Sequence, residues 1–273
     1  MAFTLCEKDN IQWVTSDVPG TKHLFSRRLG GVGDFPFSSK PDPEWESESR
    51  QERVRALWRR FRDAAEFPAE GFCFTRQVHG TALRYVTEAD RALPPLPRRP
   101  EDCDGLITDR KDVPLCVFTA DCVPVLFHDP KAGVVAAVHS GWKGTTAGVI
   151  VNAVQTMKEK YGCAAENITA VCGPSICPEC FLVHDDCAQV FFAAFGKGKY
   201  DRLMPDGRYS IDLWRIMEDQ LLSCGIKPEN ISAAHCCTCC DEDNFFSHRR
   251  GRGRSGIMLA VIDMRGAEEK SKK

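Results

Sequence analysis

Apolar side chains recur three or four positions apart in four segments of the chain, the spacing of one face of a helix. These segments are residues 46–66, 146–161, 187–195 and 212–222. In the second segment Ile150, Val154 and Met157 fall on one side. Asp212 stands where an N-cap residue would begin the last helix, and Gly225 follows that helix's end. The pattern therefore predicts four amphipathic helices.

Short apolar runs rich in β-branched residues alternate with these helical segments. They are residues 115–118, 123–127, 134–138, 170–172, 231–234 and 257–262. Runs of this length are typical of buried strands. Because strands and helices do not follow the steady alternation of a doubly wound sheet, the pattern predicts an α+β (mixed α/β) fold. We expect one layered domain around a mixed β-sheet that is flanked by helices.

The proline-rich stretch at residues 93–100 is unsuited to a helix or a central strand, so it predicts an exposed connector. Apolar segments on both sides of it look like parts of one core. We therefore expect a single domain over residues 1–267, followed by a frayed, charged tail at residues 268–273.

Composition narrows the function classes. The chain of 273 residues has 36 basic and 38 acidic residues, which gives no global case for nucleic acid or an anionic membrane as partner. Neither an apolar run of about 20 residues nor a signal peptide is evident. The 15 cysteines are an odd number in a chain too long to need a disulfide framework. These features predict a cytoplasmic protein with reduced thiols.

Two cysteine motifs and one glycine motif need separate interpretation. Residues 251–256 match a dinucleotide-binding fingerprint, but a predicted strand follows them where a helix is needed, so a basic loop is expected. Cys177/Cys180 and Cys237/Cys240 are two Cys-x-x-Cys pairs that could together hold zinc or an iron–sulfur cluster. Because more than fifty residues separate the pairs, we expect reduced thiols that line a packed turn.

Three residues of metal-binding types stand where apolar runs give way to turns: His79, Cys122 and His139. Side chains at strand ends can converge on one edge of a sheet. Two neutral imidazoles and one thiolate form a three-ligand set for catalytic zinc with the fourth position open. The sequence therefore predicts a zinc centre, with copper as the alternative ion.

The segment after His139 suits an anionic, aromatic substrate. Its glycines allow the backbone to approach a ligand closely, and it opens a predicted helix whose free N–H groups favour anions. Lys143 adds a positive charge, and Trp142 could stack on a planar ring.

Seven ordered blocks resemble the multicopper polyphenol oxidoreductase, or laccase-type, family. They are residues 25–31, 77–80, 104–108, 119–122, 137–142, 173–176, and 237–238 with 245–250. The better-tested members of this family act as purine nucleoside phosphorylases with adenosine deaminase activity. The resemblance implies small-molecule partners, namely a purine nucleoside and phosphate.

Carried over by position, the family's metal ligands fall on His79, Cys122 and His139. Its arginines fall on Arg28, Arg249 and Arg250. The chain departs from the family pattern at three places: residues 38–41 lack the family's asparagine, Lys143 replaces a common arginine, and Cys177 replaces a common glycine.

The first hypothesis is a zinc-dependent purine nucleoside phosphorylase for adenosine, inosine and methylthioadenosine, with adenosine deaminase activity. Its predicted catalytic residues are Cys122 and Asp121, the latter either a proton acceptor or an ordinary turn carboxylate. Its predicted substrate-binding residues are Arg28, Trp142, Lys143, Arg249 and Arg250, with phosphate between the arginines and the helix that follows Trp142. The usual zinc-deaminase signature is absent, so deamination would use another architecture.

Three alternatives remain open from the sequence. Cys122 and His139 could form a nucleophile–base pair of an amidase-like hydrolase that edits cell-wall precursors, dependent on the cysteine or on zinc. A laccase would need clustered imidazoles, but the chain has seven histidines and no His-x-His pair. A non-enzymatic protein could use its many thiols in redox chemistry or metal buffering.

Overall fold

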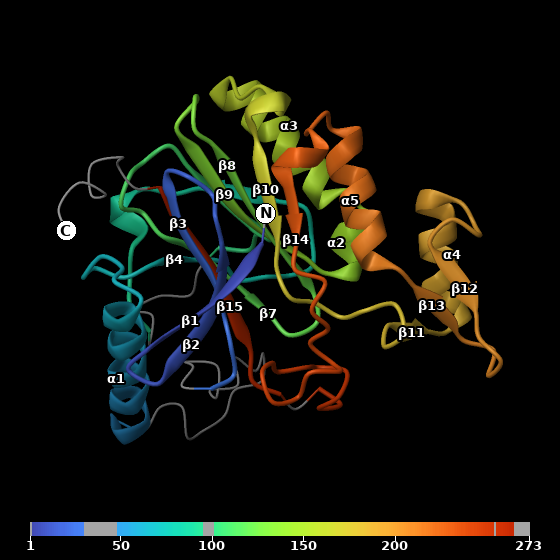
Figure 1. Ribbon diagram of the computed structural model, residues 1–273, viewed down its shortest axis with the longest axis horizontal. Helices are drawn as coiled ribbons and strands as arrows, with labels where there is room; N and C mark the ends of the chain where they lie inside the picture. The colour runs from blue at the N-terminus through green and yellow to red at the C-terminus, as the bar shows by residue number, and fades with distance from the viewer. Residues whose placement is uncertain (1, 30–47, 95–100, 254, 265–273) are drawn as a thin grey trace.

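The computed structural model describes residues 2–29, 48–94, 101–253 and 255–264, and within them two six-stranded sheets lie face to face (Figure 1). The first sheet runs in the order β1-β2-β3-β15-β7-β4. Its strands are β1 (Phe3–Lys8), β2 (Ile11–Ser16), β3 (Thr21–Ser26), β15 (Met258–Met264), β7 (Leu115–Thr119) and β4 (Cys73–Phe74). All neighbours are antiparallel except β4 and β7.

The second sheet runs in the order β14-β10-β8-β9-β6-β5. Its strands are β14 (Ile231–Ala233), β10 (Thr169–Cys172), β8 (Val123–Asp129), β9 (Val134–Ser140), β6 (Gly105–Thr108) and β5 (Leu83–Tyr85). The centre of this sheet is antiparallel, whereas the outer pairs β10–β14 and β5–β6 are parallel. The α+β class is therefore confirmed.

Helices cover the outer faces of the two sheets. These covering helices are α1 (Glu48–Ala64), α2 (Trp142–Thr146), α3 (Val149–Tyr161) and α5 (Leu213–Ser223). A further helix, α4 (Asp185–Phe195), belongs to a separate lobe, and 3-10 turns lie at Glu88–Asp90, Ala165–Asn167 and Pro228–Asn230. Helix α1 packs on the first sheet through residues such as Trp58 and Phe61, and α3 and α5 pack on the second. As predicted, Asp212 caps α5 by accepting a hydrogen bond from the Arg215 backbone N–H. No helix in the described ranges is long and apolar enough to cross a membrane.

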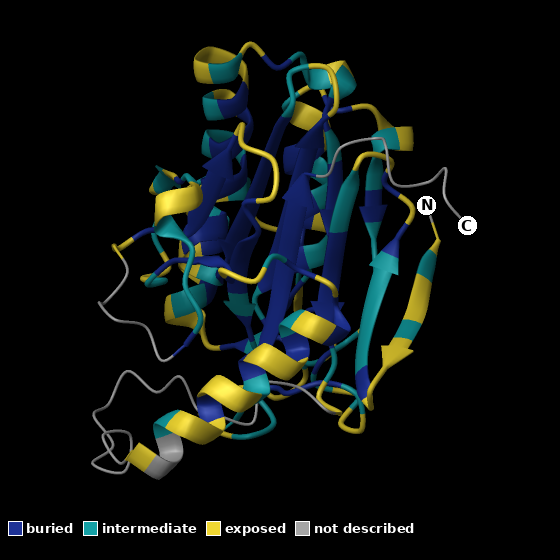
Figure 2. Ribbon diagram, turned by 90° about the vertical axis from the view of Figure 1, so that its left-hand side faces the viewer, coloured by how far each residue is buried: buried dark blue, intermediate teal, exposed yellow. Residues whose placement is uncertain are grey.

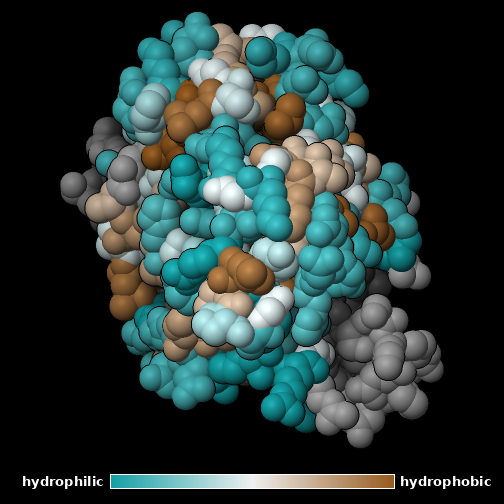
Figure 3. Space-filling model, turned by 90° about the vertical axis from the view of Figure 1, so that its right-hand side faces the viewer, coloured by the Kyte–Doolittle hydropathy of each residue, from teal (hydrophilic) through white to brown (hydrophobic). Residues whose placement is uncertain are grey.

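A small lobe lies beside the sandwich (Figure 1). It joins α4 to a three-stranded sheet of β11 (Leu182–Val183), β13 (Tyr209–Ile211) and β12 (Asp201–Leu203). Viewed from this side, hydrophobic side chains lie in separate patches among hydrophilic ones (Figure 3).

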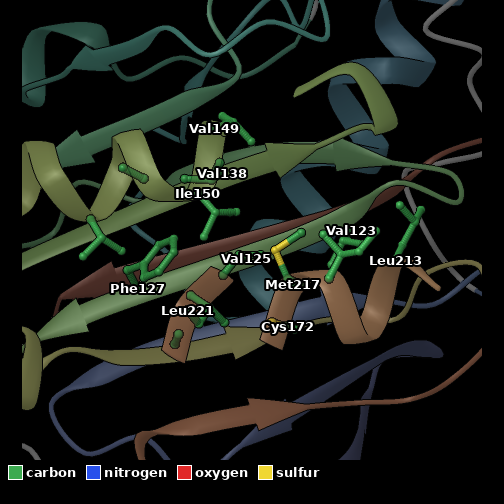
Figure 4. Packing of buried hydrophobic residues seen from close by; sticks show 14 of the residues in the cluster. Val123, Val125, Phe127, Val138, Val149, Ile150, Cys172, Leu213, Met217 and Leu221 are labelled. Atoms are coloured by element: carbon green, nitrogen blue, oxygen red, sulfur yellow. The ribbon is translucent and has the colours of Figure 1, made fainter. Parts of the chain in front are cut away.

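The central strands are buried on both faces (Figure 2). In β8, Leu126 points into the core between the two large sheets, whereas Val125 and Phe127 pack against the helices. Figure 4 shows the second of these cores, where Val149, Ile150 and other helical residues meet the sheet. Burial on both faces explains why these strands are continuous apolar runs.

Two sequence-based predictions need correction. The strands divide among two large sheets and one small one, where a single mixed sheet was expected; an apolar run looks the same whether helices or a second sheet cover its other face. The helix predicted to begin at about residue 146 begins at Val149, because Gly148 has a φ of 81° and separates it from α2.

Segments from both sides of residues 93–100 share the same sheets. Strand β3 pairs with β15, and β4 pairs with β7. These pairings agree with one domain over residues 1–267, which stays a prediction. Most of the connector and the tail at residues 268–273 lie outside the described residues.

Buried His23 in β3 makes the stability of the fold depend on pH. Burial lowers the pKa of His23 to about 4; His128 adds to this shift and Asp17 opposes it. The neutral ring accepts a hydrogen bond at Nε2 from the Ser16 backbone N–H at 3.1 Å. Unfolded His23 binds a proton near pH 6.5. Its stabilising contribution is thus complete above pH 6.5 and is lost as pH falls through 4, a difference of about 3 kcal/mol.

Urea unfolding at pH 7 and pH 4.5 tests this prediction. The free energy of unfolding should fall between pH 7 and pH 4.5 in both proteins. The fall should be about 2 to 3 kcal/mol smaller in His23→Gln than in the wild type. The matched control is His184→Gln, since His184 is exposed. Equal losses in the wild type and His23→Gln would contradict the prediction.

Candidate metal centre

The three predicted ligands lie together where the second large sheet meets two turns. His139 is in β9, Cys122 directly precedes β8, and His79 belongs to the turn after β4. The β8–β9 ladder pairs Pro124 with His139, which places Cys122 at the same end of the sheet.

The ligand atoms of His79, Cys122 and His139 all lie within 4.8 Å of one another. Cys122 Sγ is 4.0 Å from His79 Nε2, and the two imidazole rings meet edge to face with centroids 4.9 Å apart. His139 is buried, Cys122 half-buried and His79 exposed. The centre is therefore accessible to solvent on the His79 side.

Asp104 organises this centre, a role that the sequence pattern did not predict. It is fully buried immediately before β6, and it contacts His139 Nδ1 through Oδ1 at 2.8 Å. A proton on Nδ1 leaves the Nε2 lone pair of His139 available to a metal, the arrangement of carboxylate–histidine–zinc triads. The only signal in the sequence is its place within the block at residues 104–108.

The same carboxylate holds the turn that carries His79. Asp104 Oδ1 accepts a hydrogen bond from the His79 backbone N–H at 2.9 Å. Its Oδ2 accepts bonds from Gly80 at 2.7 Å and Val78 at 3.2 Å. His79 itself has a φ of 60°, which is uncommon for a residue with a side chain. Asp104 thus positions two of the three ligands.

Gly141 leaves the space that the ligand atoms need. A Cβ added there would overlap the His79 ring and would lie 3.3 Å from both Cys122 Sγ and His139 Cε1. This cradle, the soft and imidazole donors and the Asp104 carboxylate all fit a metal ion such as zinc.

Cys122 and His139 each shift the pKa of the other toward its charged form. Burial would raise the pKa of the Cys122 thiol, but His139 and His79 outweigh it and lower the pKa to about 6. Burial would likewise lower the pKa of His139, but Cys122 and Asp104 outweigh it and raise the pKa to about 9. Burial also opposes the ionisation of Asp104, yet the bonds from His139 and the turn hold its pKa below the usual range.

Asp121 precedes Cys122 and has a φ of 94°. Its Oδ1 accepts a hydrogen bond from the Thr238 hydroxyl at 2.6 Å, and its Oδ2 accepts one from the Arg249 backbone N–H at 2.7 Å. Both carboxylate oxygens therefore hold the Cys122 turn to the segment before β15. This arrangement favours the turn-carboxylate alternative over the proton acceptor.

The predicted substrate-binding residues occupy two regions. Half-buried Trp142 packs near Phe191 at a centroid distance of 6.3 Å, and the exposed Lys143 ammonium lies 5.5 Å from the Trp142 ring. Arg28 donates through Nη1 to the Glu242 carbonyl at 2.9 Å. The five-residue α2 begins beside this centre, at Trp142.

Arg249 and Arg250 are bonded to the protein backbone. Arg249 Nη1 donates to the Cys180 and Leu182 carbonyls at 2.7 and 2.9 Å. Arg250 donates to the carbonyls of residues 238, 239 and 245. These bonds hold both guanidinium groups in place. If Arg249 and Arg250 bind phosphate as predicted, they would have to do so through N–H groups that do not take part in these bonds.

Fold and site together define a four-layer α/β/β/α protein with a candidate His₂Cys metal centre at the end of one sheet. The chain belongs to the multi-copper polyphenol oxidoreductase laccase family, whose model matches residues 22–265.

Relatives named as nucleoside enzymes span most of the chain. Purine nucleoside phosphorylase YlmD of Geobacillus stearothermophilus is 34% identical over 250 residues, which cover 90% of this chain and 88% of the relative. Adenosine deaminase RL5 from an unknown prokaryotic organism is 34% identical over 195 residues, which cover 67% of this chain and 72% of the relative. The crystal structure of YlmD from G. stearothermophilus has a TM-score of 0.83 at 31% identity, covering 96% of this chain and 99% of that one.

Proposed function

We propose that this chain is a zinc-dependent purine nucleoside phosphorylase that acts on adenosine, inosine and methylthioadenosine and also deaminates adenosine. The observation that carries the proposal is the convergence of His79, Cys122 and His139 in a chain whose relatives bear the names of these two enzymes.

His79, Cys122 and His139 would hold the ion, and Asp104 would keep His139 in the tautomer that binds it. When bound, zinc supplies a Lewis acid that polarises an oxygen ligand or lowers the pKa of a water molecule. Copper, which the family's name suggests, is the alternative because thiolate and imidazole also suit it.

The surrounding residues would bind and orient the substrates. In phosphorolysis a phosphate oxygen bonds to C1′ of the ribose while the bond from C1′ to the base breaks and the base takes up a proton. Lys143 and Arg28 would provide positive charge for phosphate, together with the remaining donors of Arg249 and Arg250. Trp142 would stack on the purine ring.

The test measures both activities in the purified full chain. Inosine with phosphate should give hypoxanthine and ribose 1-phosphate, and adenosine without phosphate should give inosine and ammonia. A zinc chelator should abolish both activities, and added zinc should restore them. The proposal fails if metal-loaded protein converts neither nucleoside under these conditions.

A substitution of Lys143 tests the phosphate site. Lys143→Gln should raise the KM for phosphate at fixed inosine about tenfold or more, because a charge-assisted bond is worth about 1.5–3 kcal/mol. Arg28→Ala should act in the same direction. Lys131→Gln is the matched control, since Lys131 is exposed in the β8–β9 hairpin turn at the other end of these strands. An unchanged phosphate dependence in both Lys143→Gln and Arg28→Ala would place the phosphate elsewhere.

A second candidate is a cysteine hydrolase. The lowered pKa of Cys122, the adjoining His139 and the orienting Asp104 carboxylate form a nucleophile, base and positioning residue. An amidase-like reaction on cell-wall precursors would survive chelation and stop on alkylation of Cys122. The zinc enzyme would lose its activity on chelation.

A further inference from the structure

The two Cys-x-x-Cys pairs converge, although more than fifty residues separate them in the sequence. Strands β10 and β14 pair in parallel and lie side by side (Figure 1). Cys177 follows β10 by five residues and Cys237 follows β14 by four. The parallel register thus delivers both motifs to the same edge of the sheet. Similar placement after two strands was the signal in the sequence that could have found the cluster.

We propose that Cys177, Cys180, Cys237 and Cys240 bind one structural zinc ion, separate from the His79–Cys122–His139 centre. The four sulfur atoms lie within 4.8 Å of one another, and all four cysteines are free. Cys240 Sγ is 3.9 Å from Cys177 Sγ and 3.4 Å from Cys180 Sγ. Zinc–sulfur bonds of about 2.3 Å in a tetrahedron place the sulfurs about 3.8 Å apart. The sulfurs therefore surround a space that one ion would fill.

Backbone bonds hold the two turns together independently of any ion. Ser175 and Cys237 form a parallel bridge, and the Thr238 N–H donates to the Ser175 carbonyl at 3.1 Å. The N–H groups of Cys177 and Cys240 point at Cys237 Sγ, at 3.3 and 3.4 Å. Such donors stabilise the thiolate that binds a metal. The cluster is therefore organised for binding before the ion arrives.

The donor set selects the type of ion. Four thiolates in a tetrahedron suit zinc, and a site whose four positions are all protein ligands is structural because none remains open for substrate. A cluster of several irons and sulfides would need more room between the thiolates. Arg249 and Arg250 donate to the carbonyls of Cys180 and Cys239, so two positive charges lie beside the net negative charge of a four-thiolate zinc site.

The proposed ion would join two parts of the fold. The turn at Cys177–Cys180 leads into β11 and the small lobe, whereas the turn at Cys237–Cys240 precedes the segment that carries Arg249. Between the latter two cysteines, Thr238 donates its hydroxyl to Asp121. The zinc ion would therefore brace the lobe against the segment that holds the Cys122 turn.

Metal analysis of the full chain tests the proposal without an activity assay. Cys237→Ser/Cys240→Ser should contain one zinc per chain fewer than the wild type. The matched control is Cys236→Ser/Cys239→Ser, which changes two cysteines of the same segment that lie outside the cluster. The control should keep the wild-type zinc content.

Cobalt substitution provides a second measurement on protein with all ligands intact, should the double variant fail to fold. Wild-type protein loaded with Co²⁺ should show intense thiolate-to-cobalt bands of a four-sulfur tetrahedral site, and Cys180→Ser should weaken them. Equal zinc content in the two double variants would overturn the proposal. So would iron in place of zinc, or a disulfide between any two of these cysteines.

Discussion

Replacing Cys122 with alanine is expected to remove the metal from the His79–Cys122–His139 centre and to lower nucleoside turnover by at least about a hundredfold. Outer residues that only orient a ligand already contribute 10- to 100-fold to metal affinity or activity, and Cys122 would be a direct ligand. Its sulfur is also the only thiolate in the set. The two imidazoles left behind would not form a three-ligand site.

Metal content and kinetics of the purified variant give the measurement. Zinc should fall by one ion per chain relative to the wild type, with both nucleoside reactions lost together. Cys6→Ala is the control, because Cys6 lies in the edge strand β1 and outside both cysteine-containing clusters. If Cys122→Ala keeps its full zinc content and loss appears only in Cys237→Ser/Cys240→Ser, the His₂Cys assignment is wrong.

Replacing Asp104 with asparagine should weaken metal binding about 10- to 100-fold and also destabilise the fold. The two carboxylate oxygens face four N–H donors, from His139 and from residues 78–80. An asparagine amide keeps one acceptor and turns its NH₂ group toward the other donors. Each lost bond to a charged group is worth about 1.5–3 kcal/mol, so unfolding free energy should fall by about 3 kcal/mol or more.

Two measurements separate the effects. Competition with a chelating dye gives metal affinity, and urea unfolding of the metal-free proteins gives stability. Asp102→Asn is a suitable control, because Asp102 is exposed and its carboxylate pairs with Arg76 on the surface. Wild-type metal affinity in Asp104→Asn would show that Asp104 does not position the ligands.

Local patterns were sufficient for most of the secondary structure. The apolar face of Ile150, Val154 and Met157 is buried in α3, and the cap at Asp212 begins α5. Both signals act within one or two turns of the chain, so no distant partner is needed to recognise them. The break between α2 and α3 could not be predicted in the same way, because a glycine such as Gly148 is tolerated inside a helical pattern and its φ of 81° leaves no mark in the sequence.

The number of sheets could not be read from the same patterns. In β8, Leu126 faces the core between the sheets and Phe127 faces the helices, yet both are simply apolar in the sequence. An apolar residue predicts that its face of the strand is buried, but it does not indicate whether a helix or a second sheet covers that face. The pairing of β3 with β15, at opposite ends of the chain, is a tertiary result of the same kind.

The sequence by itself determined the types of chemistry: two imidazoles and a thiolate at strand ends, and two further cysteine pairs. Tertiary structure decided which of them meet. Asp104 became a positioning residue because β6 pairs with β9, which sets its carboxylate against His139. The cysteine pairs met because β10 and β14 are parallel neighbours. Strand register and buried hydrogen bonds bring together residues that are far apart in the chain. The local spacing of residues predicts neither the register nor these bonds.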